Sequence, residues 1–276
     1  MRKMNDSGSI PLLSSHIGRD SLHLYIMPST TDTVPQTDIK ELFEVGAHFG
    51  FTRGRRHPTA APYLFGNKEG TDIFDLEKTA QCIEAARAYV ASLAQAGKQL
   101  LIVGGKNEVT SIAKSNAERI GMPYVAGRWI GGTLTNFKIV RKRIDLLEKL
   151  MSERDAGELA KYTKKERLLI DRQIEELLTR FGGLLSMKDL PAALFVIDTR
   201  HESTAVREAN QLHIPVIGLS SSDCDFALIQ HAIPCNDTSM RSVRFVVESM
   251  ADAYAAGKRA PEAVATFNIL TQHLLP

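Results

Sequence analysis

Short, continuous apolar runs constrain the fold of this chain more than any other feature. Three of them are QLLIV at 99–103, ALFVID at 193–198 and IPVIGLS at 214–220. Runs of this kind are typical of strands that are buried on both faces of a parallel sheet. The first two lead into the helix-like segments NEVTSIAKSNAERIG and STAVREANQLH. Strands that alternate with helices through short connections predict an open, doubly wound parallel α/β sheet.

The remaining segments complete this architecture. DIFDL at 72–76 and PYVAG at 123–127 are strand-like, which brings the prediction to about five strands. Helical periodicity and capping signals predict a short helix within 37–50, a long one at 77–97 and a last one at about 240–257.

A long insertion separates PYVAG from ALFVID. Within it, apolar residues recur at three- and four-residue steps in two series on either side of a polar connection. The first series is Phe137, Val140, Ile144, Leu147 and Met151, and the second is Ile170, Ile174, Leu177 and Phe181. This spacing is typical of a coiled-coil seam, and Thr163 and Glu166 have capping-box spacing. We predict an antiparallel coiled-coil hairpin at about 133–187 that projects from the sheet domain, with two core helices as the alternative.

Charge is distributed unevenly along the chain, although its 276 residues carry a formal net charge of only +2. The segments 51–68 and 128–144 contain Lys and Arg but no Asp or Glu. Local basic stretches in a nearly neutral chain indicate a directed anion-binding surface, with ordinary solvated faces as the alternative.

The sequence has no signal for a membrane or an oxidising compartment. No apolar run reaches the roughly 18 residues of a transmembrane helix. Cys82, Cys224 and Cys235 form no CxxC pair, so a reducing, cytoplasmic location is expected. Residues 1–36 are rich in Ser, Thr and Asp and predict a disordered N-terminal extension, with a start at Met27 as the alternative. Residues 259–276 are assigned to a C-terminal tail, which leaves 37–258 as the folded domain.

Polar residues follow the predicted strands, where open parallel sheets bind ligands, so an enzyme is one hypothesis. However, the chain has no GxxxxGK[ST] or GxGxxG spacing, and GLSSS lacks the second glycine of a nucleophile elbow. Asp198 and Glu202 are candidates for an acid and a base, but loop roles fit them better. Cys224, His231 and Cys235 are weak zinc candidates without a finger spacing. We therefore expect no catalysis, no metal and no cofactor.

The two basic segments suit a phosphodiester backbone. Arg53, Arg55 and Arg56 supply fork-shaped donors in the first segment. The second, GRWIGGTLTNFKIVRKR at 127–143, places a glycine pair at a helix start, where backbone N–H groups can approach a phosphate. Trp129 in this segment is either a stacking residue or a core plug. The spread of positive charge around the helix favours a nucleic acid over a mononucleotide.

Several segments together resemble one family. LFEVGAHFG, YLFGNKEGTDIFDLEKT, RWIGGTLTNF, LPAALFVIDTRHESTAVREANQLHIPVIGLSSSDCD and IPCNDTSMRSVRFVVE resemble, in this order, the bacterial-type family of small-subunit ribosomal protein two. The resemblance covers about 37–258. It implies a flavodoxin-like (Rossmann-like) α/β domain with an inserted coiled-coil hairpin, small-subunit rRNA as the partner, and no reaction or small-molecule substrate.

Matching positions imply a set of rRNA-binding residues. They are His48, Arg53, Arg55, Arg56, His57, Lys106, Arg128, Trp129, Gly131, Gly132, Asn136, Lys138 and Arg141. The chain departs from the family at Phe51, where a histidine is usual, and at Cys235, where a glycine is usual. Arg56 and His57 replace a usual Trp-Asn pair.

The resemblance also implies partners and a location. The hairpin is expected to contact neighbouring small-subunit proteins, and in bacterial relatives the large mRNA-binding ribosomal protein one docks nearby. The ribosome is expected to be cytoplasmic, with an organellar ribosome as the less favoured alternative. The leading hypothesis is a structural rRNA-binding protein of the small subunit. The alternative is an α/β enzyme that binds a phosphorylated ligand in the crevice at the sheet's switch point.

Overall fold

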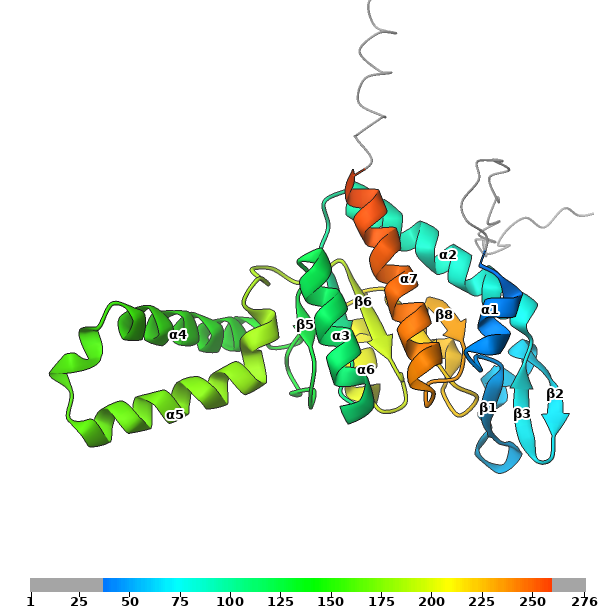
Figure 1. Ribbon diagram of the computed structural model, residues 1–276, viewed down its shortest axis with the longest axis horizontal. Coiled ribbons are helices and arrows are strands. Elements are labelled where there is room, and N and C mark those ends of the chain that lie inside the picture. The colour runs from blue at the N-terminus through cyan, green and yellow to red at the C-terminus, as the bar shows by residue number, and fades with distance from the viewer. Residues whose placement is uncertain (1–36, 260–276) are drawn as a thin grey trace, which may run out of the picture. The chain divides into compact units, whose positions relative to one another are not determined.

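A five-stranded parallel sheet forms the centre of the computed structural model, which describes residues 37–259 (Figure 1). Its strands are β4 (Leu100–Val103), β5 (Tyr124–Val125), β6 (Ala193–Ile197), β7 (Val216–Ser220) and β8 (His231–Pro234). They lie in the order β5-β4-β6-β7-β8, and every neighbouring pair is parallel. Because the winding direction changes between β4 and β6, the sheet has the doubly wound, flavodoxin-like topology with its switch point there.

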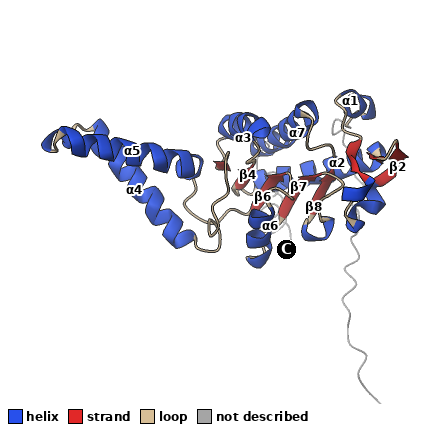
Figure 2. Ribbon diagram, turned by 90° about the horizontal axis from the view of Figure 1, so that it is seen from below, coloured by secondary structure: helices blue, strands red, loops and turns tan. Residues whose placement is uncertain are grey.

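Helices cover both faces of this sheet. The helices α2 (Leu76–Gln95), α3 (Asn107–Ile120) and α7 (Met240–Arg259) share one buried cluster with Leu100, Ile102 and Phe195. On the other face, α6 (Ser203–Gln211) packs with Leu101 and Val103. Figure 2 shows α3 and α7 on one side of the strands and α6 on the other. Burial on both faces explains why whole strands are apolar.

A second, three-stranded antiparallel sheet precedes the main one. It consists of β1 (Phe49–Thr52), β2 (Leu64–Lys68) and β3 (Thr71–Phe74) in the order β1-β3-β2, and α1 (Ile39–Glu44) leads into it. Two 3-10 helices, η1 (Arg53–Arg55) and η2 (Pro58–Tyr63), connect β1 to β2, and η5 (Phe226–Leu228) precedes β8. We refer to residues 46–74 as the N-terminal ribbon.

The predicted insertion contains two long helices, α4 (Phe137–Asp155) and α5 (Lys164–Phe181), which run antiparallel and extend away from the sheet in Figure 1. The short 3-10 helices η3 (Glu158–Lys161) and η4 (Gly182–Leu184) precede and follow α5. The capping box of Thr163 and Glu166 is present at the start of α5. Val140, Ile144 and Phe181, near the root, belong to the same buried cluster as α6. The hairpin is therefore partly core at its root, and regular coiled-coil packing along its length stays a prediction.

Most predicted elements are confirmed, but three strands, β1, β2 and β8, were not predicted. The fifth strand of the parallel sheet is β8, which contains His231 and was not predicted, whereas the strand-like DIFDL belongs to the antiparallel sheet. The signal for β8 in the sequence is weak, because Ile233 is the only strongly apolar residue among its four. The predicted extension at 1–36 and all of the predicted tail except Arg259 lie outside the described residues. Among residues 37–259, no helix combines the length and apolar character that crossing a membrane requires.

Candidate nucleic-acid interface

Cations line the carboxyl ends of the parallel strands. Arg128 follows β5, Lys106 follows β4 and Arg200 follows β6. Arg55 reaches the loop after β7 from the N-terminal ribbon, and its Nη2 lies 3.1 Å from Oδ2 of Asp223. Neighbouring strands are about 4.8 Å apart, so this row spans roughly 14 Å from β5 to β7. We call Arg128, Lys106, Arg200 and Arg55 the strand-end row.

Asp223 holds two members of this row. Nη1 of Arg200 lies 2.6 Å from Oδ2 of Asp223, the oxygen that Arg55 also contacts. The Asp223 side chain is 3% exposed, whereas those of Arg55 and Arg200 are 54% and 53% exposed. The guanidinium carbon of Arg55 also lies 4.2 Å from the ring centroid of Phe51. One buried carboxylate thus fixes two arginines while more than half of each side chain remains accessible, which suits phosphate recognition.

Lys106 is more enclosed than the arginines. Its Nζ contacts Oδ2 of Asp198 and lies 3.4 Å from Oδ2 of Asp237. Burial lowers the pKa of Lys106, but these two carboxylates outweigh burial and leave it raised. Burial and the charge of Asp198 raise the pKa of Asp237 to about 7. Lys106 is therefore an ion-pair residue that neutralises buried acid at the strand ends.

The first basic loop separates into residues with different roles. Arg56 forms a bidentate pair with Asp72, with Nε 2.7 Å from Oδ2 and Nη2 in contact with Oδ1. Asp72 is fully buried, and the hydrogen bond from Arg56 is the main reason why its pKa is lowered. Arg53 is exposed and forms no ion pair within residues 37–259. Arg56 therefore holds the ribbon together, whereas the exposed side chain of Arg53 is accessible to a ligand.

Ser222, in the loop after β7, anchors the ribbon to the main sheet. The N–H of Phe51 donates to Oγ of Ser222 at 2.8 Å, and the N–H of His57 donates to the carbonyl oxygen of Ser222 at 2.8 Å. A Cβ on Gly50 would lie only 3.0 Å from Oγ of Ser222, so the close approach favours glycine. Nδ1 of His57 lies 2.8 Å from Oγ1 of Thr59 at the start of η2. These contacts set the ribbon beside the strand-end row.

His48 packs against aromatic rings of the ribbon region. Its ring centroid lies 4.6 Å from that of Phe43, with the rings nearly parallel, and 4.1 Å from that of Phe49. Burial lowers the pKa of His48, so the imidazole is mainly neutral near pH 7. The ring is thus used in packing, and its contact with rRNA stays a prediction.

A carboxylate of the protein fills the turn formed by the glycine pair. Oε1 of Glu208, on α6, accepts hydrogen bonds from Nε1 of Trp129 at 3.1 Å and from the N–H of Gly132 at 2.7 Å. Its Oε2 accepts from the N–H groups of Leu134 at 3.0 Å and Thr135 at 3.2 Å. Burial raises the pKa of Glu208, but these hydrogen bonds outweigh it, so the pKa is lowered.

Glu208 therefore occupies the position that a phosphate takes at a glycine-rich turn. The N–H of Gly132, which the sequence suggested as a phosphate donor, is already donated to this carboxylate. Trp129 is 8% exposed, and its indole N–H is also used, which favours its interpretation as a core residue. Gly131 and Asn136, in the same segment, are exposed.

Arg141 also has an internal role. Its Nε lies 2.7 Å from Oδ1 of Asp145, and its Nη2 lies 2.9 Å from Oε1 of Glu148. Its Nη1 donates to the carbonyl oxygen of Met187 at 3.1 Å, which ties α4 to the segment after α5. Lys138, earlier on α4, is exposed and forms no ion pair within residues 37–259. Of the predicted cations, Arg53, Arg128 and Lys138 are thus the exposed ones without an ion pair in that range.

A buried carboxylate occupies part of the switch-point crevice. The N–H of Gly105 donates to Oε1 of Glu202 at 3.2 Å, and the Glu202 side chain is only 3% exposed. This carboxylate lies where a bound phosphate would accept hydrogen bonds from the start of α3. Asp198 and Asp237 add further negative charge nearby. Glu202 therefore occupies the backbone donor that a phosphorylated ligand in this crevice would use.

The three weak zinc candidates have other surroundings in the structure. Sγ of Cys235 lies 2.9 Å from Oγ of Ser242, and the ring of His231 stacks on that of Tyr89 with centroids 4.0 Å apart. Burial raises the pKa values of Cys224 and Cys235 to about 12, so both remain thiols. Among residues 37–259, no group of three or more His, Cys, Asp or Glu side chains is placed to hold a metal.

Two residues of this region were not predicted as site residues. Arg200 follows β6 as Lys106 follows β4, so its position at a strand end was the available signal. Glu208 lies among the buried residues Val206 and Ala209, and an acidic residue on the apolar face of a helix was the signal there. Neither signal identifies the residues that Arg200 and Glu208 contact, because these contacts depend on the fold.

Comparison with known proteins places these observations in one family. The family model described as "Ribosomal protein S2" matches residues 42–257. The chain is 41% identical over 226 residues to small ribosomal subunit protein uS2 of Roseiflexus sp. (strain RS-1), which covers 82% of this chain and 86% of the relative. It is 42% identical over 218 residues to the uS2 protein of Chloroherpeton thalassium, covering 79% and 87% of the two chains. For the uS2 protein of Chloroflexus aggregans, the identity is 38% over 233 residues, covering 84% and 98%.

The family match spans the main sheet, the hairpin and all of the N-terminal ribbon, so it applies to the whole of the candidate interface. The chain belongs to the ribosomal protein S2 family, whose members are structural proteins rather than enzymes.

Proposed function

We propose that this protein is a structural component of the small subunit of a cytoplasmic ribosome, where it binds small-subunit rRNA. The similar proteins are named as small ribosomal subunit proteins. The observation that supports rRNA binding most directly is the strand-end row, in which Arg55 and Arg200 are fixed by one buried carboxylate. Accessible, pre-positioned guanidinium groups spread over several strands suit successive phosphates of an RNA backbone.

The filled anion positions support the same proposal. Glu202 and Glu208 accept the backbone N–H groups that would otherwise bind a single phosphate at Gly105 and Gly132. The cations that are still available for binding are exposed side chains spread over a surface. This distribution favours a long polyanion over a small phosphorylated ligand.

Co-sedimentation tests this proposal. A tagged full-length chain, expressed in cells, should migrate with small subunits on a sucrose gradient. Binding of the purified protein to small-subunit rRNA should weaken steeply as salt rises, because the cations displace counterions from several phosphates. Arg55→Gln should weaken binding at low salt. Lys165→Gln removes the same charge at the far end of the hairpin and serves as the matched control. Saturable, salt-insensitive binding of ATP or NAD without subunit association would contradict the proposal.

For the hairpin, contact with neighbouring small-subunit proteins is proposed, and the mRNA-binding ribosomal protein one is the named candidate. Near the start of α5, Leu168 and Leu169 are 51% and 54% exposed, and Tyr162 is 37% exposed. Exposed apolar side chains at one end of a charged hairpin suit a protein partner. A photo-crosslinking amino acid at Leu169, compared with one at Lys149 on α4, should capture a ribosomal protein within assembled subunits. Crosslinks from Leu169 to rRNA alone would contradict this.

A further inference from the structure

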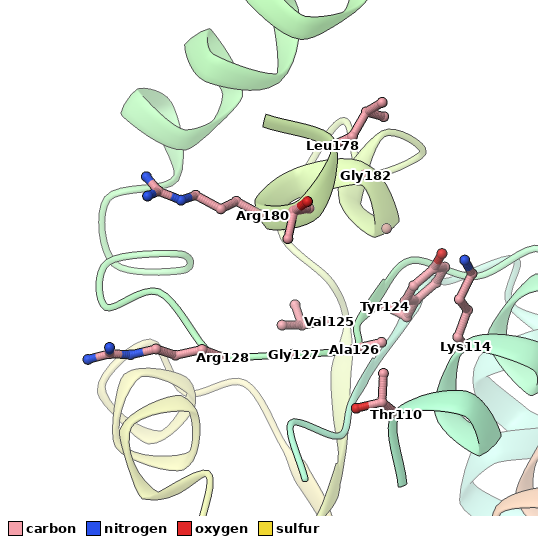
Figure 3. Close-up of a pocket in the computed structure, with 12 residues that line it drawn as sticks. Thr110, Lys114, Tyr124, Val125, Ala126, Gly127, Arg128, Leu178, Arg180 and Gly182 are labelled. Atoms are coloured by element: carbon pink, nitrogen blue, oxygen red, sulfur yellow. The ribbon is translucent and has the colours of Figure 1, made fainter. Parts of the chain in front are cut away.

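A pocket of about 470 Å³ lies at the root of the hairpin, between the edge strand β5 and the end of α5 (Figure 3). Its walls are formed by β5 and the chain after it, by α3, and by the last turn of α5 with η4. Pockets of roughly 300–1,000 Å³ are large enough for a small organic ligand. Because β5 is at the edge of the sheet, this pocket lies on the other side of β4 from the switch point between β4 and β6.

The residues that line this pocket include three cations, Lys114, Arg128 and Arg180, and no Asp or Glu. Figure 3 shows the side chains of Arg128 and Arg180 extending toward the same side, with Lys114 across the pocket from them. Arg128 forms no ion pair within residues 37–259. The pocket therefore offers positive charge on two sides.

Two of these cations have exposed ion pairs outside the lining. Arg180 lies 2.7 Å from Glu176, and Lys114 lies 3.9 Å from Glu118. All four side chains are more than half exposed. Exposed pairs of this kind are weak and exchange readily for a phosphate.

An aromatic ring completes the pocket. Tyr124 lies in the wall, and its hydroxyl donates a hydrogen bond to Oε1 of Glu118 at 2.9 Å. Burial, with help from Glu118, raises the pKa of Tyr124 to about 12, so the phenol stays neutral. A Cβ on Gly183 would lie 2.2 Å from the carbonyl oxygen of Tyr124, so η4 approaches this residue closely. The ring is thus held in place beside Lys114, across the pocket from Arg128 and Arg180 (Figure 3).

We propose that this pocket holds one unpaired nucleotide of a single-stranded RNA segment, with its base against Tyr124 and its flanking phosphates at Arg128 and Arg180. The inference rests on the proposed function, because the RNA in question is rRNA. A duplex keeps its bases stacked inside the helix, whereas loops and bulges expose bases that stack on aromatic side chains. Stacking on an aromatic ring tolerates any base, so the pocket selects single strands rather than a sequence.

Binding of fluorescein-labelled heptauridylate to the full chain, followed by fluorescence anisotropy, tests this inference. The double variant Arg128→Gln, Arg180→Gln should raise the dissociation constant at least about tenfold, because charged contacts to both phosphates are lost. The variant Lys164→Gln, Lys165→Gln removes the same charge at the far end of the hairpin and should change it less than about twofold. A fully paired RNA hairpin of similar charge should bind more weakly than heptauridylate and respond equally to both variants.

The ring is tested separately. Tyr124→Phe keeps the stacking face and should bind heptauridylate like the wild type. Tyr124→Leu should weaken binding at least about fivefold, the lower limit for loss of one base stack. If Tyr124→Leu does not fold, crosslinking of a 4-thiouridine oligomer to the wild-type chain decides, with crosslinks expected within 124–128.

Three results would overturn the inference. One is an equal loss of heptauridylate binding in both double variants, which indicates general electrostatics. The second is displacement of heptauridylate by AMP or inorganic phosphate at comparable concentrations, which indicates a site for small anions. The third is 4-thiouridine crosslinking only outside the pocket. If the wild-type chain co-sediments with small subunits under any of these results, the proposed function stands, whereas a failure to co-sediment removes the function itself.

Discussion

Nε1 of Trp129 donates a hydrogen bond to Oε1 of Glu208, 3.1 Å away, and the two residues are only 8% and 7% exposed. This contact joins the segment that enters the hairpin to α6, across 79 positions of sequence. The same carboxylate accepts the N–H groups of Gly132, Leu134 and Thr135. A single buried charge therefore fixes the chain at the point where the hairpin leaves the sheet domain.

Glu208→Gln should lower the free energy of unfolding by about 2–4 kcal/mol, because an amide cannot replace both acceptor oxygens and leaves buried N–H groups unpaired. Urea denaturation near pH 7 measures this. Glu176→Gln on the exposed face of α5 is the matched control and should change stability by less than about 0.5 kcal/mol. The advantage of wild type over Glu208→Gln should be fully present above the unfolded pKa of about 4.3 and disappear as pH falls through the lowered folded pKa. Equal stability of Glu208→Gln and wild type at pH 7 would contradict this role.

Trp129→Phe should lower stability by about 1–3 kcal/mol, since it leaves a smaller ring in the core and removes the N–H donor to Glu208. Tyr162→Phe, on the exposed connection of the hairpin, is the control and should be nearly neutral. Binding of rRNA should not change in Trp129→Phe once the protein is folded, as a filter-binding titration would show. Weaker rRNA binding with unchanged stability would instead indicate that the indole stacks on RNA.

The sheet and the two hairpin helices could be predicted from sequence because each leaves a strong periodic pattern. β4, β6 and β7 are buried throughout, and their continuous apolar runs reflect this directly. The small N-terminal sheet left a weaker pattern, because its strands are short and β2 is mostly exposed. β8 was missed because only Ile233 and Pro234 are buried in it.

The candidate site was harder to predict than the fold. Arg53, Arg55 and Arg56 are almost adjacent in sequence, yet one is exposed, one shares Asp223 and one is paired to fully buried Asp72. These differences depend on acids contributed by distant segments, which no local pattern reveals. For the same reason, the sequence suggested that the Gly132 turn was open, although Glu208 fills it.

Arg56→Gln and Arg53→Gln should therefore behave differently although they lie in one loop. Arg56→Gln leaves the buried carboxylate of Asp72 without its ion-pair partner and should lower stability by about 2–4 kcal/mol. Arg53→Gln should change stability by less than about 0.5 kcal/mol but weaken rRNA binding. The slope of log affinity against log salt concentration should become shallower by about one, because one phosphate contact is lost. Thermal unfolding and rRNA titrations at several salt concentrations measure both effects. The same stability loss in the two variants would contradict the assignment of Arg56 as the structural member.

Asp237 gives the chain a specific pH dependence. Burial and the charge of Asp198 raise its pKa in the folded state to about 7, whereas a carboxyl in the unfolded chain releases its proton near pH 4. Its contribution to the free energy of unfolding is thus fully present below about pH 4 and is lost as pH rises toward 7. Asp237→Asn cannot titrate, so relative to wild type it should gain at least about 1 kcal/mol of stability between pH 5 and pH 7.5.

Urea denaturation of both proteins at the two pH values measures this difference. Asp155→Asn, at the exposed end of α4, serves as the control and should follow the wild-type curve. Lys106 opposes the effect, because its ammonium lies 3.4 Å from Oδ2 of Asp237 and stabilises the charged carboxylate. Lys106→Met should therefore steepen the loss of stability with rising pH. Parallel curves for wild type and Asp237→Asn from pH 5 to pH 7.5 would show that Asp237 is ionised throughout and that its pairing with Lys106 overrides burial.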